Sequence, residues 1–292
     1  DNRELKSLLM NPESSVFDKV FIWTGDFRII IGIIKYLEDR LNVEHDSKIV
    51  GVQNVIVIED SVRYYSAFLP IIYTEMLKQS QRLISEGINL THKHLRMRAR
   101  PKILLCTNYE EAWGYFEKYK ELVLGIISDI AFPRNGEIDD TAGIKFTQAV
   151  KESISDIPIL LTSNNPDNEE DAKRAGASFI LKDSPILITR LQHFMNNNFG
   201  FGDFIFKTAD GHEVGRAYDL KCMEEQLKVV PLESIKFHAE RNHFSNWFKA
   251  RTEFWLAHML RPRKVSDYPT GEALRKDLVH SIHDYRMARQ RG

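Results

Sequence analysis

The sequence lacks the features of a disulfide-rich, membrane-spanning or strongly charged protein. Its two cysteines, Cys106 and Cys222, are too few for a disulfide framework, which favours a reducing compartment such as the cytoplasm. It has no run of about 18 or more apolar residues, so we expect neither a membrane span nor a membrane partner. Lys and Arg total 40 against 41 Asp and Glu, for a net charge of −1. This balance provides no basic field that would attract nucleic acid.

The composition is that of a globular chain with more than one domain. Hydrophobic residues make up 43% and charged residues 28% of the 292 positions, which excludes a disordered or collagen-like chain. At about 150 residues per domain, this length predicts two domains. The chain starts at Asp1, without an initiator Met, and we therefore expect it to be a piece of a longer protein.

A regular alternation of short apolar runs and helical segments begins near Gln53. Five runs are expected to be strands, at 54–58, 102–106, 122–128, 158–161 and 179–181. Each is followed by an expected helix, at 62–86, 109–119, 143–153, 169–175 and 186–196. The first run is apolar at nearly every position, as in a parallel strand that is covered on both faces. We therefore predict an α/β fold with a five-stranded, parallel, doubly wound sheet.

The segments on either side of this region are expected to have different structures. Residues 18–24 have the composition of a strand and 27–42 that of a helix. Together they are either the tail of an upstream α/β domain or an element docked onto the next domain. Beyond residue 199, a β-hairpin that turns at Asp210-Gly211 precedes a mostly helical module.

Charged and hydroxyl side chains follow the predicted strands at the points where they end. They are Glu59, Asp60, Asp129, Thr162, Ser163 and Lys182. The carboxyl ends of parallel strands meet at one edge of a sheet, where ligands bind in doubly wound folds. Three clustered carboxylates repel one another and require a cation, and oxygen ligands suit Mg²⁺. A hydroxyl and an amine beside them suit an anion, so we predict a metal-assisted site where a carboxylate accepts a phosphoryl group.

These residues, in this order, make the segment 54–199 resemble the receiver domain of bacterial response regulators, which has a flavodoxin-like fold. The family's acidic pair after the first strand corresponds to Glu59-Asp60. Its acceptor motif, an Asp followed four residues later by Pro, corresponds to Asp129–Pro133. The resemblance implies that Asp129 accepts a phosphoryl group and that Lys182, after the fifth strand, pairs with the acylphosphate.

The resemblance also implies which residues hold the cation and respond to phosphorylation. The implied Mg²⁺ ligands are Glu59, Asp60, Asp129 and the backbone carbonyl of Ala131. Ser163, five residues beyond Pro158, would bind a phosphoryl oxygen, with Thr162 as the alternative. Phe179, three residues before Lys182, would be the aromatic switch residue.

The chain departs from the usual receiver pattern in two places near the site. The segment after Asp129 is expected to be a long loop that runs through Thr141. The usual Lys-Pro pair is replaced by Lys182-Asp183. Neither departure removes a chemical group, but both affect the surface that receivers use to pass on their state.

On this resemblance the chain divides into three units. Residues 1–49 would be the tail of an upstream degenerate receiver-like domain, 50–199 the receiver, and 200–292 a hairpin with a helical module. This order is similar to the N-terminal part of bacterial phosphoenolpyruvate synthase-like (pyruvate phosphate dikinase-related) proteins. It implies a histidine kinase or a small phosphodonor as partner and control of downstream phosphoenolpyruvate synthase-like domains. The chain shows none of their catalytic motifs, so its own enzymatic activity stays open.

Other interpretations of the same residues stay open. The segment Asn242–Arg251 has a faint likeness to a recognition helix, which would make the chain a DNA-binding response regulator, although its balanced charge speaks against this. The acidic cluster could instead serve a Mg²⁺-dependent phosphatase, or the domain could dock to partners without being phosphorylated. His238 and His243 lack a third ligand in sequence and are not expected to bind metal. A homodimer is also open.

Overall fold

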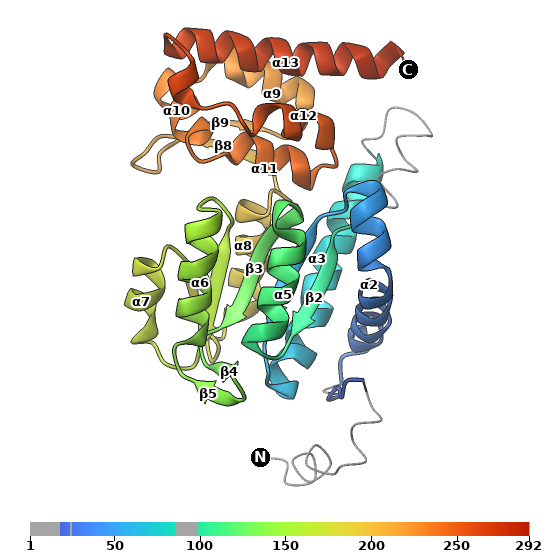
Figure 1. The fold of residues 1–292 in the computed structure, drawn as a ribbon. Coiled ribbons are helices and arrows are strands. Elements are labelled where there is room, and N and C mark those ends of the chain that lie inside the picture. Colours follow the sequence, from blue (N-terminus) through green and yellow to red (C-terminus); the bar gives the residue numbers. More distant parts are fainter. Residues whose placement is uncertain (1–17, 24, 86–98, 292) are drawn as a thin grey trace.

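Five parallel strands form the central sheet of the protein (Figure 1). The computed structural model describes residues 18–23, 25–85 and 99–291. The strands are β1 (Asn54–Ile58), β2 (Lys102–Cys106), β3 (Val123–Asp129), β6 (Ile159–Ser163) and β7 (Ser178–Leu181). Their order is β2-β1-β3-β6-β7, the flavodoxin-like order of a doubly wound sheet. The predicted α/β fold with a five-stranded parallel sheet is therefore confirmed.

Helices cover both faces of the sheet because alternate strand residues point to opposite sides. In β1, Val55 and Val57 belong to the apolar cluster on one face, whereas Ile56 and Ile58 belong to the cluster on the other. The first face is covered by α3 (Val62–Ser85) and α8 (Leu187–Asn198), and the second by α5 (Tyr109–Tyr119), α6 (Ala142–Ser153) and α7 (Asn168–Arg174). All residues of β1 are buried, which explains its nearly continuous apolar sequence.

The segment after β3 is not the long loop that the sequence predicted. Two short strands, β4 (Phe132–Arg134) and β5 (Glu137–Asp139), form an antiparallel hairpin there. Asn135 and Gly136 between them have φ values of 53° and 83°, and a type I′ turn requires positive φ at both positions. The Asn-Gly pair is a hairpin signal, but the strands beside it are too short to show an alternating pattern.

The C-terminal module consists of a β-hairpin followed by helices, as the sequence predicted. Its elements are β8 (Phe204–Lys207), β9 (Glu213–Ala217), α9 (Leu220–Val229), α10 (Leu232–Ala239), α11 (His243–Ala250), α12 (Phe254–Leu260) and α13 (Gly271–Arg291). Lys249 Nζ donates to the carbonyl of Glu121 at 3.0 Å, and Arg261 pairs with Asp156 at 3.1 Å. Glu121 and Asp156 precede β3 and β6, so the module docks at the amino ends of the strands (Figure 1).

One long helix, α2 (Arg28–Val50), lies on the outside of the α/β unit against α3 and β2. It is longer than the predicted helix at 27–42 and ends at Gly51, whose φ of 72° suits a helix C-terminus. The strand expected over 18–24 does not form in the described residues 18–23. Within the part of the chain that the structure describes, every helix is too short or too polar to cross a lipid bilayer.

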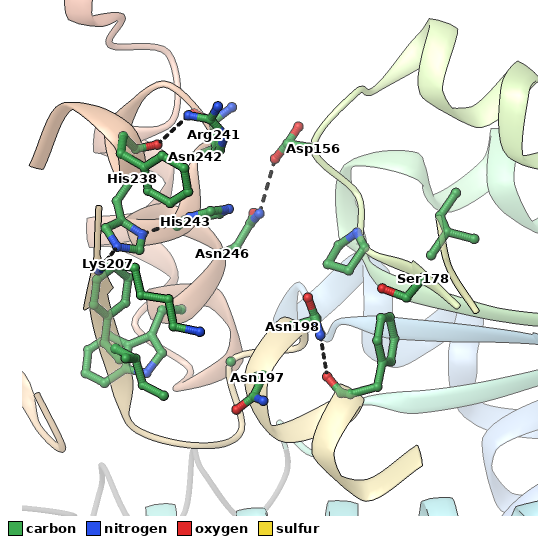
Figure 2. A pocket seen from close by; sticks show the side chains of 18 of the residues that line it. Asp156, Ser178, Asn197, Asn198, Lys207, His238, Arg241, Asn242, His243 and Asn246 are labelled. Atoms are coloured by element: carbon green, nitrogen blue, oxygen red, sulfur yellow. Dashed lines mark hydrogen bonds between the residues drawn. The ribbon is translucent and has the colours of Figure 1, made fainter. Parts of the chain in front are cut away.

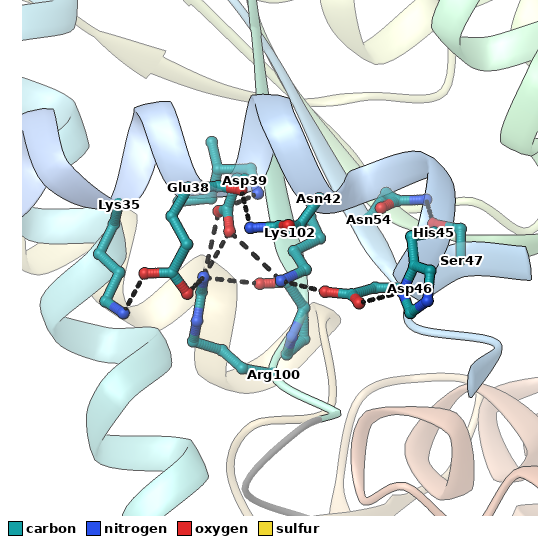
Figure 3. Close-up of polar contacts among 12 residues, drawn as sticks. Lys35, Glu38, Asp39, Asn42, His45, Asp46, Ser47, Asn54, Arg100 and Lys102 are labelled. Atoms are coloured by element: carbon teal, nitrogen blue, oxygen red, sulfur yellow. Dashed lines mark hydrogen bonds and ion pairs between the residues drawn. The ribbon is translucent and has the colours of Figure 1, made fainter. Parts of the chain in front are cut away.

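A buried ion-pair network joins α2 to the edge strand β2 (Figure 3). The fully buried carboxylate of Asp39 pairs with Arg100 and lies 3.7 Å from Lys102 Nζ. It also accepts hydrogen bonds from the Ile103 amide at 2.9 Å and from the Tyr73 hydroxyl at 3.0 Å. The Asp39 carboxylate thus accepts the hydrogen bond of a backbone amide in the edge strand β2. Helix α2 therefore packs along the edge strand β2.

Asp39→Asn keeps the shape of this side chain but removes the one fully buried carboxylate beside Arg100, so that the guanidinium keeps only the more distant, partly exposed Glu38, while Lys102 keeps Asp46 at 2.7 Å. We expect it to lower the free energy of unfolding, measured in urea, by about 3 kcal/mol, as for other broken buried ion pairs. Glu38→Gln is the matched control, because Glu38 is 39% exposed and lies 3.6 Å from the same guanidinium. Glu38→Gln should lower the free energy of unfolding by less than about 1 kcal/mol. If both variants lower the free energy of unfolding equally, the buried charge of Asp39 has no special importance for stability.

Candidate functional site

The predicted acidic cluster forms at the carboxyl ends of the strands, at the edge away from the C-terminal module (Figure 1). Glu59 and Asp60 follow β1, and Asp129 is the last residue of β3. Lys182 follows β7, at the far end of the same edge. Parallel pairing brings these strand ends level with one another, as the sequence predicted for residues in these positions.

The ammonium group of Lys182 joins two of the carboxylates. Its Nζ donates to Glu59 Oε2 and to Asp129 Oδ2, at 2.6 Å in both cases. The side chain of Lys182 is 2% exposed and that of Glu59 1%, so this ion pair is shielded from water. The same Nζ lies 4.2 Å from the centre of the Tyr64 ring, which is a cation–π contact. Two carboxylates and one aromatic face therefore fix the position of a single buried positive charge.

The charges at this edge shift the pKa values of their neighbours. Burial raises the pKa of Glu59, and the charge of Asp129 adds to this while Lys182 opposes it. Burial and the charge of Asp129 likewise raise the pKa of Asp60. For Lys182, burial lowers the pKa, but Glu59 and Asp129 outweigh it and the net shift is upward. The lysine therefore stays charged, whereas burial favours the protonated forms of Glu59 and Asp60.

The three carboxylates fit a divalent cation. Oxygens of Glu59, Asp60 and Asp129 lie within 4.8 Å of one another. When all three are ionised, the single ammonium leaves two negative charges unbalanced, which one divalent cation would neutralise. Oxygen donors suit Mg²⁺ better than a softer metal. Among the described residues, this is the one group of three or more acidic, histidine or cysteine side chains close enough to share an ion.

Asp129 is held in one orientation yet remains open to solvent. Its side chain is 13% exposed, against 1% for Glu59. Asp129 Oδ1 accepts a hydrogen bond from the Ile130 amide at 2.7 Å, and Oδ2 accepts the bond from Lys182. Helix α6 begins directly against this turn, because a Cβ atom at Gly143 would lie only 2.2 Å from the Asp129 carbonyl. Asp129 is therefore a positioned carboxylate that an incoming group can reach.

The two hydroxyl groups that the sequence proposed have different partners. Ser163 Oγ accepts hydrogen bonds from the Asn165 amide at 3.1 Å and from the Asn168 side chain at 2.9 Å. Thr162 Oγ1 donates to the carbonyl of Ser128 at 3.3 Å, and Ser128 directly precedes Asp129 in sequence. In the described site, neither hydroxyl is hydrogen-bonded to a carboxylate. The choice between Ser163 and Thr162 stays a prediction.

The remaining two predicted residues lie beside the cluster. Phe179 is a half-buried residue of β7 that pairs with Leu161 and packs on the α5–α6–α7 side of the sheet. Ala131 lies between β3 and β4, two residues after Asp129. The switching role of Phe179 and the ligand role of the Ala131 carbonyl also stay predictions.

Two contacts of the site were not identified from the sequence. Tyr64 lies in the first turn of α3, and its hydroxyl donates to Asn164 Oδ1 at 3.0 Å, which holds the ring beside Lys182. Asn168, at the start of α7, donates to the Ser163 hydroxyl. Both residues come soon after a strand end, but pairing an aromatic ring with a lysine from a distant strand requires the folded sheet.

A second polar region is a cavity of about 760 Å³ between the sheet and the C-terminal module (Figure 2). In it, His238 Nδ1 and His243 Nδ1 lie 2.9 Å apart, and the Lys207 amide donates to His238 Nε2 at 2.8 Å. Because Nε2 accepts, His238 carries its proton on Nδ1 and donates it to His243. Burial and the neighbouring His243 lower the pKa of His238 to about 3, and burial lowers that of His243 to about 4. The neutral pair links α10, α11 and β8.

No family model and no curated protein matches this chain. Among solved structures, it is similar to a response regulator receiver domain protein from Clostridium thermocellum, with 16% identity and a TM-score of 0.30 over 50% of this chain and 92% of that one. A putative response regulator from Chloroflexus aurantiacus is 18% identical, with a TM-score of 0.30 over 50% of this chain and 99% of that one. A chemotaxis protein from Vibrio cholerae is 18% identical, with a TM-score of 0.29 over 49% and 98%.

Similarity at this level adds nothing to the strand order and the site geometry, which support the fold assignment by themselves. None of these three similar proteins is a phosphoenolpyruvate synthase-like protein, so the predicted parent protein gains no support from them. The flavodoxin-like sheet, with an acidic cluster and a buried lysine at its carboxyl edge, is what the chain itself establishes.

Proposed function

We propose that residues 50–199 are a phosphoacceptor receiver domain of two-component signal transduction, in which Asp129 accepts the phosphoryl group. The observation that carries the proposal is the position of Lys182, whose buried ammonium group bridges Glu59 and Asp129 at 2.6 Å. This arrangement supports an acceptor role because it places a fixed cation beside a carboxylate that is still open to solvent. An anion that joins Asp129 would meet a partner already in place.

The proposed reaction forms one bond and breaks one. An oxygen of Asp129 attacks the phosphorus atom of the donor while the bond to the leaving group breaks, and the electron pair of that bond departs with the leaving group. The donor is the phosphohistidine of a histidine kinase or a small acyl phosphate. The product is an acyl phosphate on Asp129. Lys182 would then exchange its bond to the carboxylate for one to a phosphoryl oxygen.

Glu59, Asp60 and Asp129 would hold Mg²⁺, with the backbone carbonyl of Ala131 as a further ligand. When bound, the ion would neutralise charge on the phosphoryl group during transfer. The Ile130 amide and Lys182 keep the acceptor carboxylate in one orientation, so little ordering is needed when the donor arrives.

Phosphorylation would change the state of the domain through a hydroxyl group and an aromatic ring. Ser163, or alternatively Thr162, would give up its present hydrogen bonds for one to a phosphoryl oxygen. Phe179, which is half-buried in the same region, would follow the hydroxyl inward. The strands β3 and β6 run from this edge to the edge where the C-terminal module docks, so they offer the shortest path between the two.

The proposal extends to an attached phosphoenolpyruvate synthase-like enzyme. Residues 200–292 would pass the phosphorylation state of residues 50–199 to such an enzyme. The order of units in the sequence supports this extension. The proposed enzyme domains themselves are not among the residues of this chain.

Incubation with acetyl phosphate and Mg²⁺ tests the proposed chemistry on the full chain. We expect the intact mass to rise by about 80 Da, the mass of one phosphoryl group, and hydroxylamine to reverse the rise. Asp129→Asn should show no adduct, since an amide is a poor nucleophile for phosphorus. Asp139→Asn is the matched control, because Asp139 lies on the nearby hairpin and should leave the adduct intact. An unchanged mass with every donor would point to a docking domain instead.

Lys182→Met tests the electrostatic role of the lysine independently of phosphotransfer. Without its ammonium group the buried carboxylates repel one another, so we expect the free energy of unfolding to fall by about 3 kcal/mol in the absence of Mg²⁺. Mg²⁺ should stabilise this variant more than the native chain, because the site then carries an additional uncompensated negative charge. The control Lys173→Met, with a side chain 57% exposed, should change stability by less than about 0.5 kcal/mol. A Lys182→Met variant as stable as the native chain would contradict this electrostatic role.

A further inference from the structure

The outer side of α2 carries a row of large apolar side chains that remain exposed. Their exposed fractions are 70% for Phe27, 53% for Ile30, 57% for Ile34, 41% for Leu37 and 79% for Leu41. None of them belongs to an apolar cluster of the described residues. Single exposed apolar residues are common, but a contiguous row of five on one helix marks an interaction surface.

The spacing of this row is that of a coiled-coil seam. Successive members are three, four, three and four residues apart, which places them at alternating a and d positions of two heptads. The opposite side of the helix is already in use, because Gly32, Tyr36, Asp39 and Val43 are buried against the α/β unit. Helix α2 therefore has one face that holds it to its own domain and a second, seam-like face whose side chains are exposed. The helix itself lies at the outside of the α/β unit (Figure 1).

We propose that this seam, formed by Phe27, Ile30, Ile34, Leu37 and Leu41, is a homodimer interface in which α2 packs antiparallel against α2 of a second copy of this chain. A seam with strict three–four spacing fits another helix with the same spacing, and the second copy supplies one. A surface that pairs with itself about a two-fold axis closes after two copies and leaves no free face. This interface is separate from the carboxyl edge that carries the acidic cluster.

Charged residues beside the seam favour the antiparallel orientation. Asp26 and Arg40 both occupy g positions, directly before the first and the last apolar members of the seam. In an antiparallel pair, g positions face g positions, so Asp26 of each copy would lie beside Arg40 of the other. In a parallel pair, Arg40 would face the region of His45, and no opposite charges would meet. In the monomer, Asp26 pairs with Arg28 and Arg40 with Asp18, through side chains that are at least one-third exposed, and ion pairs of this kind contribute little to stability.

The seam is large enough to support a dimer because α2 is already a folded helix before association, so binding need not order it. The row extends over about 22 Å of helix, and its five side chains expose on the order of 500 Å² of apolar surface. A standard interface buries about 800 Å² on each partner, so Ile31, which is 37% exposed, and the polar side chains beside the seam would have to bury the remainder. An isolated helix of two heptads would be marginal, but Asp39 and its partners hold α2 in place before association.

Sedimentation equilibrium of the full chain over a range of concentrations tests this interface. We expect a reversible monomer–dimer equilibrium. Ile34→Glu places two charges in the middle of the seam of each dimer and should raise the dimer dissociation constant at least about 100-fold. Ile49→Glu is the matched control, since Ile49 is on the same helix and 72% exposed but lies off the seam; it should leave the constant unchanged. Ile34 is exposed in the monomer, so its substitution should not alter the unfolding transition of the monomer.

Charge exchange tests the orientation of the two helices. Asp26→Arg and Arg40→Asp should each weaken the dimer, and the double variant should restore it, because both charges then meet again with opposite sign. A double variant weaker than both single variants would overturn the antiparallel arrangement. A chain that stays monomeric at every concentration, or a dimer that Ile34→Glu does not weaken, would overturn the interface itself and show that another segment or another protein covers the seam.

Discussion

The contact on which the site depends is the buried ammonium group of Lys182 between Glu59 and Asp129. Without it, the parallel sheet would bring three carboxylates together at one edge with no internal counter-charge. When all three carboxylates are ionised, the ammonium group leaves two negative charges, which one divalent cation would neutralise. Burial is the main cause that raises the pKa values of Glu59 and Asp60, and the charge of Asp129 adds to it. The same lysine is the natural partner for an anion on Asp129.

The chain uses three separate surfaces of one α/β unit. The carboxyl edge of the sheet holds the acidic cluster, and the amino edge holds the C-terminal module through the contacts of Lys249 and Arg261. Helix α2 packs on the edge strand β2, where its Asp39 accepts a hydrogen bond from the Ile103 amide, and its outer face carries exposed apolar side chains. The strands β3 and β6 connect the carboxyl edge with the edge where the module docks.

The sequence predicted the sheet and the acidic edge because both follow from local patterns: apolar runs define the strands, and parallel strand ends must converge. It did not predict the role of Asp39, since a polar residue in a helix is expected to face solvent and its partner Arg100 is distant in sequence. The aromatic segment at 18–24 has strand composition, but its described residues 18–23 form no strand. The Tyr64–Lys182 contact joins a helix to a distant strand. Local propensity says nothing about contacts of this kind.

The most direct measurement is the chemical identity of the residue that accepts phosphate. The full chain would be treated with acetyl phosphate and Mg²⁺ and then reduced with borohydride, which converts an aspartyl phosphate into homoserine, and its peptides would be mapped by mass spectrometry. The proposed chemistry predicts homoserine at position 129 and an unmodified Asp60 a few ångströms away. Homoserine at position 60, a stable phosphate on Ser163 or Thr162, or an unmodified Asp129 would contradict it.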